Sequence, residues 1–328
     1  MPNLKSLLVP VAVFALLSCT SPLASAKTWR IGFVPKLIGI PYFNAMHEGF
    51  EKGAKAFGAK ITYQGATTAS VSGQVQVTQS LINKHLDAVG VSSNSPTALE
   101  AQADAAKKAG VLFYSSDSQV DGPSVSLRVA PANDQDIGFT VVDQIAGQIG
   151  GTGDIAIVSG GATATNLNVW IGFMKQRLAA KYPGVHLVSI QYAGEDISKA
   201  TDLTAQLLSA YPNLKGVIGA NSTAVPGAAQ AVLRAGLTGK VAVTGITDPN
   251  TIRPFVRNGV VKSVVLWSPV DLAYVTTWGI VQLLEHKTIA ASNQVPGVTD
   301  PVTFDAATNT MLLGKPLVIT SANIDLNF

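Results

Sequence analysis

Short apolar runs alternate along most of the chain with segments in which apolar residues recur every three or four positions. The run 29–34 is apolar and is followed by Pro35, which is typical of a β-strand. The next segment has the spacing of one helix face, with apolar residues at Phe43, Met46, Phe50, Ala54 and Phe57. Gly58 follows directly, so we expect that helix to end there.

The same alternation predicts many further elements. Strands are expected at 60–63, 87–91, 111–114, 154–158, 185–190, 216–218, 240–244 and 262–266, and helices at 71–82 and 96–109. Near-continuous apolar strands separated by helices are typical of parallel sheets covered on both faces. The pattern therefore predicts an α/β fold.

Two stretches of the chain resemble each other. Residues 79–117 and 205–248 both show a helix, a strand, an Asn-Ser loop, a second helix, a glycine and a second strand before an aspartate. Asn94-Ser95 aligns with Asn221-Ser222 in this comparison. General βαβ patterning explains much of the likeness, but the matching loops favour two similar halves, each with strand ends that can hold a ligand.

The first 26 residues have the pattern of a secretory signal peptide. Lys5 precedes the apolar run 7–17, which is shorter than the roughly 20 residues of a membrane span, and Ala24-Ser25-Ala26 has the small residues of a cleavage site. An alternative is a lipoprotein anchored through Cys19, because 16–19 resembles a lipobox. Either way, the chain is expected to reach the periplasm.

Composition narrows the possible functions. Hydrophobic residues make up 47% and charged residues 13% of the chain, which excludes intrinsic disorder, and the net charge of +3 does not indicate a nucleic-acid partner. The four histidines are widely separated and there is one cysteine, so no metal site is predicted. No dinucleotide motif follows the first strand, and neither a phosphate-binding loop nor a nucleophile elbow is present, so we expect no cofactor and no enzyme activity.

Polar residues gather where the predicted strands end. Lys36, Asn94, Asp117, Asn166 and Asn221 all follow such strands or lie in the loops after them. Ammonium, amide and carboxylate groups together can donate to and accept from the hydroxyls of a small neutral ligand. Tyr42 and Phe43 open the first helix, where a ring can lie against C–H groups.

Each of these residues also has a purely structural interpretation. Alternatives are a solvated charge at Lys36, core packing at Phe43 and Trp267, a turn at Asp117, helix N-caps at Asn94 and Asn221, and a helix start at Pro226-Gly227-Ala228. The shared location at strand ends favours the ligand site.

Four segments carry a resemblance to a known family. They are IGFVPKLIGIPYF (31–43), ITYQGATTASVSGQVQ (61–76), AVPGAAQAV (224–232) and DPNTIRPFVRNGVVKSVVLW (248–267). With them, nearly the whole chain after residue 26 resembles bacterial periplasmic sugar-binding proteins of ABC importers, of the type I, ribose-binding-like fold. The likeness is greatest to the autoinducer-2-binding and rhamnose-binding branch.

The resemblance implies a set of ligand contacts. Lys36, Asp117 and the backbone at Pro226 and Ala228 match positions that hold the ligand in autoinducer-2 receptors. Tyr42, Phe43, Asn221 and Trp267 match further positions at the sugar or the cleft. Where those receptors carry an Asp-Gln pair, this chain has Asn166-Leu167, and Thr247 stands where ribose-type binders place an aspartate. A pentose, deoxyhexose, tetrose or polyol is therefore a better expectation than autoinducer-2.

The family fold implies two Rossmann-like lobes joined by a hinge of three crossings, near 130–133, 267–269 and 291–296. The N-terminal lobe would be 27–130 plus 269–292, and the C-terminal lobe 131–268 plus 293–328. Such proteins close around their ligand. The expected function is that of a monomeric, non-enzymatic receptor delivering a small sugar or polyol to an ABC permease. A sugar-presenting sensory receptor and an exported carbohydrate-processing enzyme are the alternatives.

Overall fold

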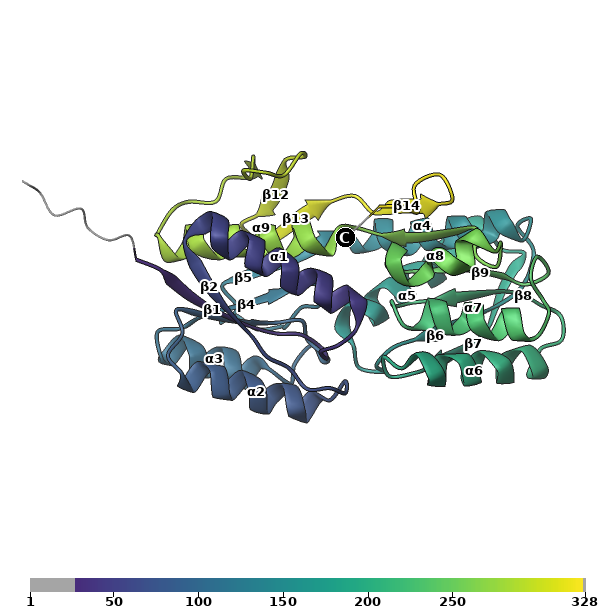
Figure 1. The fold of residues 1–328 in the computed structure, drawn as a ribbon, viewed down its shortest axis with the longest axis horizontal. Coiled ribbons are helices and arrows are strands. Elements are labelled where there is room, and N and C mark those ends of the chain that lie inside the picture. Colours follow the sequence, from purple (N-terminus) through teal and green to yellow (C-terminus); the bar gives the residue numbers. More distant parts are fainter. Residues whose placement is uncertain (1–26, 327–328) are drawn as a thin grey trace, which may run out of the picture.

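The computed structural model describes residues 27–326, and the chain forms two α/β lobes that lie side by side (Figure 1). The expected signal peptide 1–26 and the alternative anchor Cys19 lie outside the described residues. Each lobe is built around its own mainly parallel sheet, as the alternating pattern predicts.

The first lobe contains an eight-stranded sheet in the order β11-β12-β13-β5-β4-β3-β1-β2. Its N-terminal strands are β1 (Trp29–Val34), β2 (Ala59–Tyr63), β3 (Ala88–Val91), β4 (Leu112–Ser116) and β5 (Leu127–Ala132), and all of their pairings are parallel. Its helices are α1 (Pro41–Phe57), α2 (Val71–Asn83), α3 (Glu100–Lys108) and α9 (Pro269–Leu284). Helices α1 and α9 cover one face of the sheet and α2 and α3 the other (Figure 1).

Close contact between α1 and α9 joins an early and a late segment of the chain in the first lobe. A Cβ atom on Gly49 of α1 would lie 2.2 Å from the carbonyl oxygen of Val270 in α9. One turn further along α1, a Cβ atom on Gly53 would lie 2.7 Å from the Cβ of Thr277. The two helix backbones therefore approach each other where α1 has no side chains.

The second lobe contains a four-stranded parallel sheet in the order β7-β6-β8-β9. Its strands are β6 (Gly153–Ser159), β7 (Val185–Tyr192), β8 (Leu214–Gly219) and β9 (Ala242–Gly245). Its helices are α4 (Asp134–Gln148), α5 (Thr165–Lys181), α6 (Ile197–Ala210), α7 (Ala224–Arg234) and α8 (Pro249–Arg257). Strand β10 (Ser263–Leu266) lies beside β9, with an isolated bridge between Ile246 and Val265, and forms a separate antiparallel pair with β14 (Leu317–Thr320).

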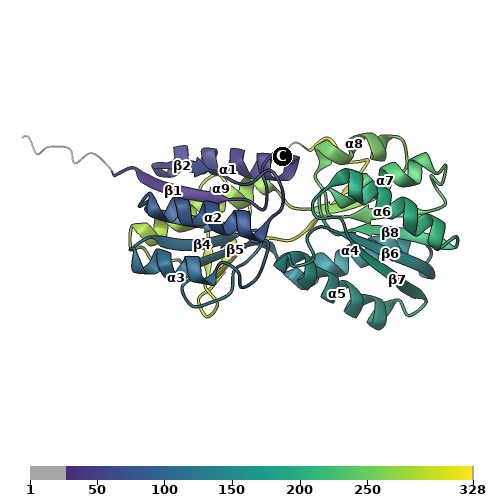
Figure 2. The ribbon, with the colours of Figure 1, turned by 90° about the horizontal axis from the view of Figure 1, so that it is seen from below.

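The chain passes between the lobes after β5, after β10 and between β13 and β14 (Figure 2). The expected third crossing near 291–296, and with it the placement of 293–314 in the C-terminal lobe, is wrong. Strands β11 (Ser292–Asn293), β12 (Val302–Asp305) and β13 (Thr310–Gly314) belong to the first sheet, and β13 pairs in parallel with β5. This pairing covers the backbone edge that β5 would otherwise expose. Because β13 ends in the first lobe at Gly314 and β14 begins in the second lobe at Leu317, the third crossing occurs at 314–317.

Candidate functional site

A pocket lies between the lobes at the carboxyl ends of their strands. It encloses about 340 Å³ of space between atoms, part of which is open to solvent. Its lining consists of Lys36, Ile40, Tyr42, Phe43, Asp117, Asn166, Leu167, Trp170, Glu195, Asn221, Ser222, Ile246 and Trp267. Both lobes contribute polar groups to this pocket.

Asp117 is the central acceptor on the first-lobe side of the pocket. It follows β4 with a φ of 73°, and its side chain is buried. One carboxylate oxygen accepts from the Tyr42 hydroxyl at 2.8 Å, and the other accepts from the Ser92 hydroxyl at 2.6 Å. Because each oxygen has two acceptor positions, Asp117 is held in place and can still accept from a ligand.

Tyr42 links Asp117 to the crossing after β10. Its hydroxyl accepts from Trp267 Nε1 at 2.9 Å while it donates to Asp117. Burial, with the negative charge of Asp117 as a further cause, raises the pKa of Tyr42 well above its ordinary value. Tyr42 therefore remains a neutral donor. Trp267 donates to Tyr42 and Tyr42 donates to Asp117, so both hydrogen bonds run toward the carboxylate.

Lys36 brings a buried ammonium group into the pocket. It lies after β1, only 4% of it is exposed, and its Nζ donates to Asn166 Oδ1 of α5 in the second lobe at 2.7 Å. Beneath it, the Asn94 side chain donates to the Lys36 carbonyl at 3.0 Å and so supports this loop. The ammonium is therefore positioned from both lobes.

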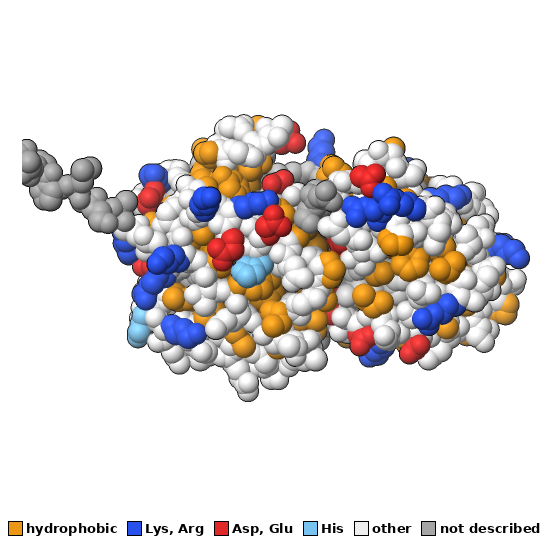
Figure 3. Space-filling model, viewed as in Figure 1, with side chains coloured by type: hydrophobic (Ala, Val, Ile, Leu, Met, Phe, Trp, Pro, Cys, Tyr) orange, Lys and Arg blue, Asp and Glu red, His pale blue; other side chains and the backbone are white. Residues whose placement is uncertain are grey.

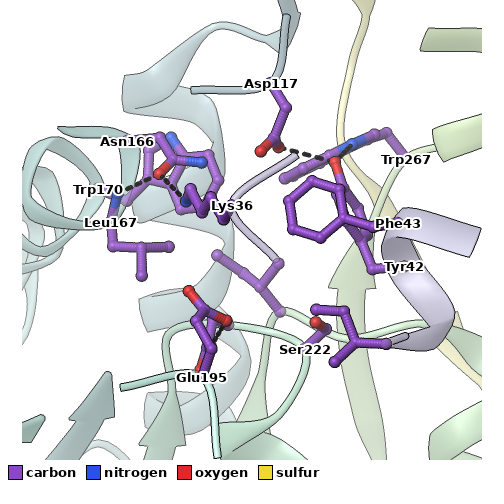
Figure 4. Close-up of a pocket in the computed structure, with 13 residues that line it drawn as sticks. Lys36, Tyr42, Phe43, Asp117, Asn166, Leu167, Trp170, Glu195, Ser222 and Trp267 are labelled. Carbon is purple, nitrogen blue, oxygen red and sulfur yellow. Dashed lines mark hydrogen bonds between the residues drawn. The ribbon is translucent and has the colours of Figure 1, made fainter. Parts of the chain in front are cut away.

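Aromatic rings form a continuous wall beside these polar groups (Figure 4). The rings of Tyr42 and Phe43 meet edge to face with centroids 5.2 Å apart, and Trp267 meets Trp170 of α5 at 5.5 Å. Trp170 is fixed by its Nε1 donating to Asp134 at 2.6 Å. Such a wall suits the C–H face of a ring-shaped ligand, because it adds apolar contact without adding charge.

The second lobe contributes a carboxylate that the sequence analysis missed. Glu195 lies in the loop between β7 and α6, and its carboxylate accepts a short hydrogen bond from Asn221 Nδ2. Burial raises the pKa of Glu195, although the nearby Lys36 ammonium opposes that shift. Its position follows the strand-end rule used for the other site residues, and applying that rule to the strand 185–190 would have found it.

Most of the predicted site residues line this pocket, namely Lys36, Tyr42, Phe43, Asp117, Asn166, Asn221 and Trp267. Asn94, Pro226 and Ala228 do not. Asn94 supports Lys36 from below, and Pro226 and Ala228 are buried in the first half of α7. Asn221 lines the pocket, and its Oδ1 also accepts from the Ala224 N–H at 3.1 Å near the start of α7.

Direct hydrogen bonds hold the lobes together beside the pocket. Thr163 Oγ1 donates to the Asn94 carbonyl at 2.8 Å, and Thr165 Oγ1 donates to the Gln119 carbonyl at 3.2 Å. Both threonines belong to the second lobe and both carbonyls to the first. Together with the bond from Lys36 to Asn166, they tie the two sides of the cleft.

Elsewhere in the described chain, charge and composition add no competing site. Residues 27–326 contain no cluster of three or more His, Cys, Asp or Glu that could hold a metal ion. In the same range, every helix is too short or too polar to cross a membrane. Lys and Arg side chains are mixed with Asp and Glu over the face in Figure 3 rather than gathered in one basic patch.

Known proteins share both the sequence pattern and the fold. The periplasmic binding protein domain family matches residues 31–288. The D-allose-binding periplasmic protein of Escherichia coli (strain K12) is 28% identical over 273 residues, covering 78% of this chain and 84% of that protein. The D-ribose/D-allose-binding protein of Pseudomonas aeruginosa is 24% identical over 240 residues, covering 70% and 74%.

Solved structures of solute-binding proteins share the fold of this chain. An ABC transporter solute-binding protein from Clostridium phytofermentas with bound L-rhamnose has a TM-score of 0.86 at 28% identity, covering 92% of this chain and 98% of that one. LsrB from Clostridium saccharobutylicum in complex with AI-2 shares the fold, with a TM-score of 0.86 at 23% identity and coverage of 91% and 100%. The match over most of the chain and the two-lobed fold lead to one conclusion: this chain belongs to the periplasmic binding protein domain family and is a binding protein rather than an enzyme.

Proposed function

We propose that this protein captures a small neutral sugar or polyol between its lobes and delivers it to the permease of an ABC importer. The observation that carries the proposal is the pocket itself. Two carboxylates, one ammonium and two amides face a space that is bounded by aromatic rings and shared by both lobes. Such a set of groups can both donate to and accept from several hydroxyls, while the rings contact the C–H face.

The relatives support this class of ligand. The relatives described above bind D-allose, D-ribose and L-rhamnose, which are all uncharged monosaccharides. In this chain the pair Asn166-Leu167 places an amide and an aliphatic side chain at the pocket, where the resemblance to autoinducer-2 receptors implies Asp-Gln. A pentose, a deoxyhexose, a tetrose or a polyol therefore remains the proposed class, and autoinducer-2 is disfavoured.

We further propose that the lobes move about the crossings at 132–134, 266–269 and 314–317. The first lobe would then be about 27–132 plus 269–314, and the second about 133–268 plus 315–326. Ligand bound to both lobes stabilises the closed form, which the permease would recognise. The mature protein would begin after residue 26 and act in the periplasm as a monomer, free or anchored at Cys19.

A thermal-shift screen of purified residues 27–328 against tetroses, pentoses, deoxyhexoses and polyols tests the proposal. A ligand at about 100 times its Kd adds about 2.7 kcal/mol to stability, which raises the Tm by about 4 °C for a chain of roughly 300 residues. The control is Asp117→Ala, which removes the central acceptor and should reduce the shift by about half or more. If no compound class raises the Tm, and the protein carries no sugar after purification, the proposal fails.

A further inference from the structure

Glu195 combines features that seldom occur together at a residue with a purely structural role. It is 7% exposed and has a φ of 65°, directly after Gly194 with a φ of 70°. Glutamate is uncommon in this left-handed region, which glycine, asparagine and aspartate tolerate better. Strained residues of this kind cluster at ligand sites, where the surrounding structure holds them in place.

The surrounding elements fix the direction of the Glu195 side chain. Before it, Ala193 and Gly194 donate to the carbonyls of Ser159 and Gly160, at 2.7 and 3.0 Å, which extends the pairing of β7 with β6. After it, Asp196 caps α6 by accepting from the Lys199 N–H at 2.9 Å. The loop is therefore tied at both ends, and Figure 4 shows the Glu195 carboxylate pointing into the pocket from the side opposite Asp117.

Space for this carboxylate depends on the backbone beside it. A Cβ atom on Gly160 would lie 2.5 Å from Glu195 Oε1 and 2.9 Å from Asn221 Nδ2. Asn221 Nδ2 donates to Oε2 and also to Thr223 Oγ1, at 2.9 Å for the latter. Oε2 is thus held by the protein, while Oε1 accepts from no side chain among the hydrogen bonds of the described residues. A carboxylate oxygen in that position can accept a hydroxyl.

We propose that Glu195 is the specificity-determining residue of the second lobe and that its Oε1 accepts a hydroxyl of the bound sugar or polyol. This inference rests on the proposed function. Asp117 and Glu195 would then grip one ligand from opposite lobes, with the Lys36 ammonium between them. Leu167 and Ile246 also line the pocket from the second lobe and offer no acceptor. The amide oxygens of Asn166 and Asn221 already accept from Lys36 and from the Ala224 N–H, which leaves Glu195 as the charged acceptor of this lobe beside the Ser222 hydroxyl. Glu195 would therefore select ligands whose hydroxyl reaches this side of the cleft.

The test compares Glu195→Gln with wild-type protein by isothermal titration calorimetry, using D-allose, D-ribose and L-rhamnose as probes. Glutamine keeps the shape, and its one carbonyl oxygen can still accept from Asn221. The position of Oε1 is then taken by an NH2 group, so the charged acceptor for the ligand hydroxyl is lost. Charged hydrogen bonds are about twice as strong as neutral ones, so affinity for the best probe should fall about tenfold or more. The matched control is Glu51→Gln on the exposed surface of α1, which should bind like wild type.

Thermal unfolding without ligand separates this role from a structural one. A buried carboxylate replaced by an uncharged isostere should leave the Tm unchanged or raise it, whereas a structural glutamate would lower it. Gly160→Ala provides a second variant that keeps Glu195 but displaces its carboxylate together with the Asn221 amide that holds it, and we expect it also to weaken binding. It does so without altering the charge of the pocket.

The outcomes are distinct. If the wild type binds a probe and the Kd of both Glu195→Gln and Gly160→Ala stays within twofold of it, the role of Glu195 is overturned. The proposed function then still stands. A lower Tm for Glu195→Gln with unchanged affinity would assign the residue to structure alone. If wild-type protein binds none of the probes and no compound in the wider screen, the proposed function itself fails, and this inference fails with it.

Discussion

Two threonine hydroxyls of the second lobe offer a way to measure how strongly the lobes hold each other. Thr163 and Thr165 donate across the cleft to the backbone carbonyls of Asn94 and Gln119, and neither threonine lines the pocket. Replacing both with valine keeps their shape and removes both bonds. The change therefore acts on closure and leaves the groups that face the ligand in place.

The size of the effect follows from the number of bonds lost. A typical hydrogen bond contributes about 0.5–1.5 kcal/mol net, so two contribute about 1–3 kcal/mol to the closed form. When the open form predominates without ligand, the apparent Kd rises by the same factor by which the closed population falls. We expect an increase in Kd of about 2- to 13-fold for Thr163→Val and about 5- to 150-fold for the double variant.

The assay combines calorimetric titration with small-angle X-ray scattering, which reports the radius of gyration with and without sugar. Thr201→Val is the matched control, because Thr201 Oγ1 donates at 2.9 Å to the Ile197 carbonyl within α6 and crosses no cleft. That control should lower stability slightly and leave Kd unchanged. A double variant that binds as tightly as wild type, with the same compaction on binding, would show that these bonds do not contribute to closure.

Three further changes test other parts of the structure. Asp117→Asn should weaken sugar binding about tenfold or more in calorimetric titration, because charged hydrogen bonds to the ligand are lost. The control is Asp202→Asn, at an exposed position of α6, and an equal loss of affinity in both variants would contradict the site. Gly49→Ala should lower the unfolding free energy by about 1–3 kcal/mol in urea titration, because its Cβ would meet α9, whereas Gly172→Ala, with open space around it, should not destabilise. Burial raises the pKa of Glu195 in the folded state above the roughly 4.3 of the unfolded chain, so the wild type loses stability as pH rises through this window. The gain in unfolding free energy from Glu195→Gln should therefore grow from pH 4 to pH 7 in denaturant titrations, and a gain that does not change with pH would refute the assigned cause.

Periodicity was sufficient to predict the α/β class and most of the N-terminal elements. The apolar face from Phe43 to Phe57 coincides with α1, and the run 29–34 coincides with β1. The start of α3 differs from its prediction, since 96–99 form a turn in which Ser95 Oγ accepts from the Ala98 N–H at 3.3 Å, and the helix begins at Glu100. Proline at a helix start and proline in a turn look alike in sequence.

The C-terminal strands could not be predicted from local patterns, and Glu195 could be predicted only in part. Strands β12 and β13 are short, and they become part of the sheet only because β5 offers them an edge, which no local pattern records. Strand ends were enough to bring Lys36 and Asp117 together. Glu195 also follows a predicted strand, 185–190, but its neighbour Asp196 caps α6, so the strand-end location alone does not separate a pocket acceptor from a helix cap.

The contact between α1 and α9 has a consequence for how the protein folds. Helix α9 and strands β11–β13 are synthesised after the main segment of the second lobe, yet they complete the sheet and helix layer begun by β1 and α1. Contacts between residues so distant in sequence slow folding. The second lobe, whose five helices and parallel sheet are nearly continuous in sequence, should therefore become native first, and a nascent chain would remain incompletely folded until almost its last residues have emerged.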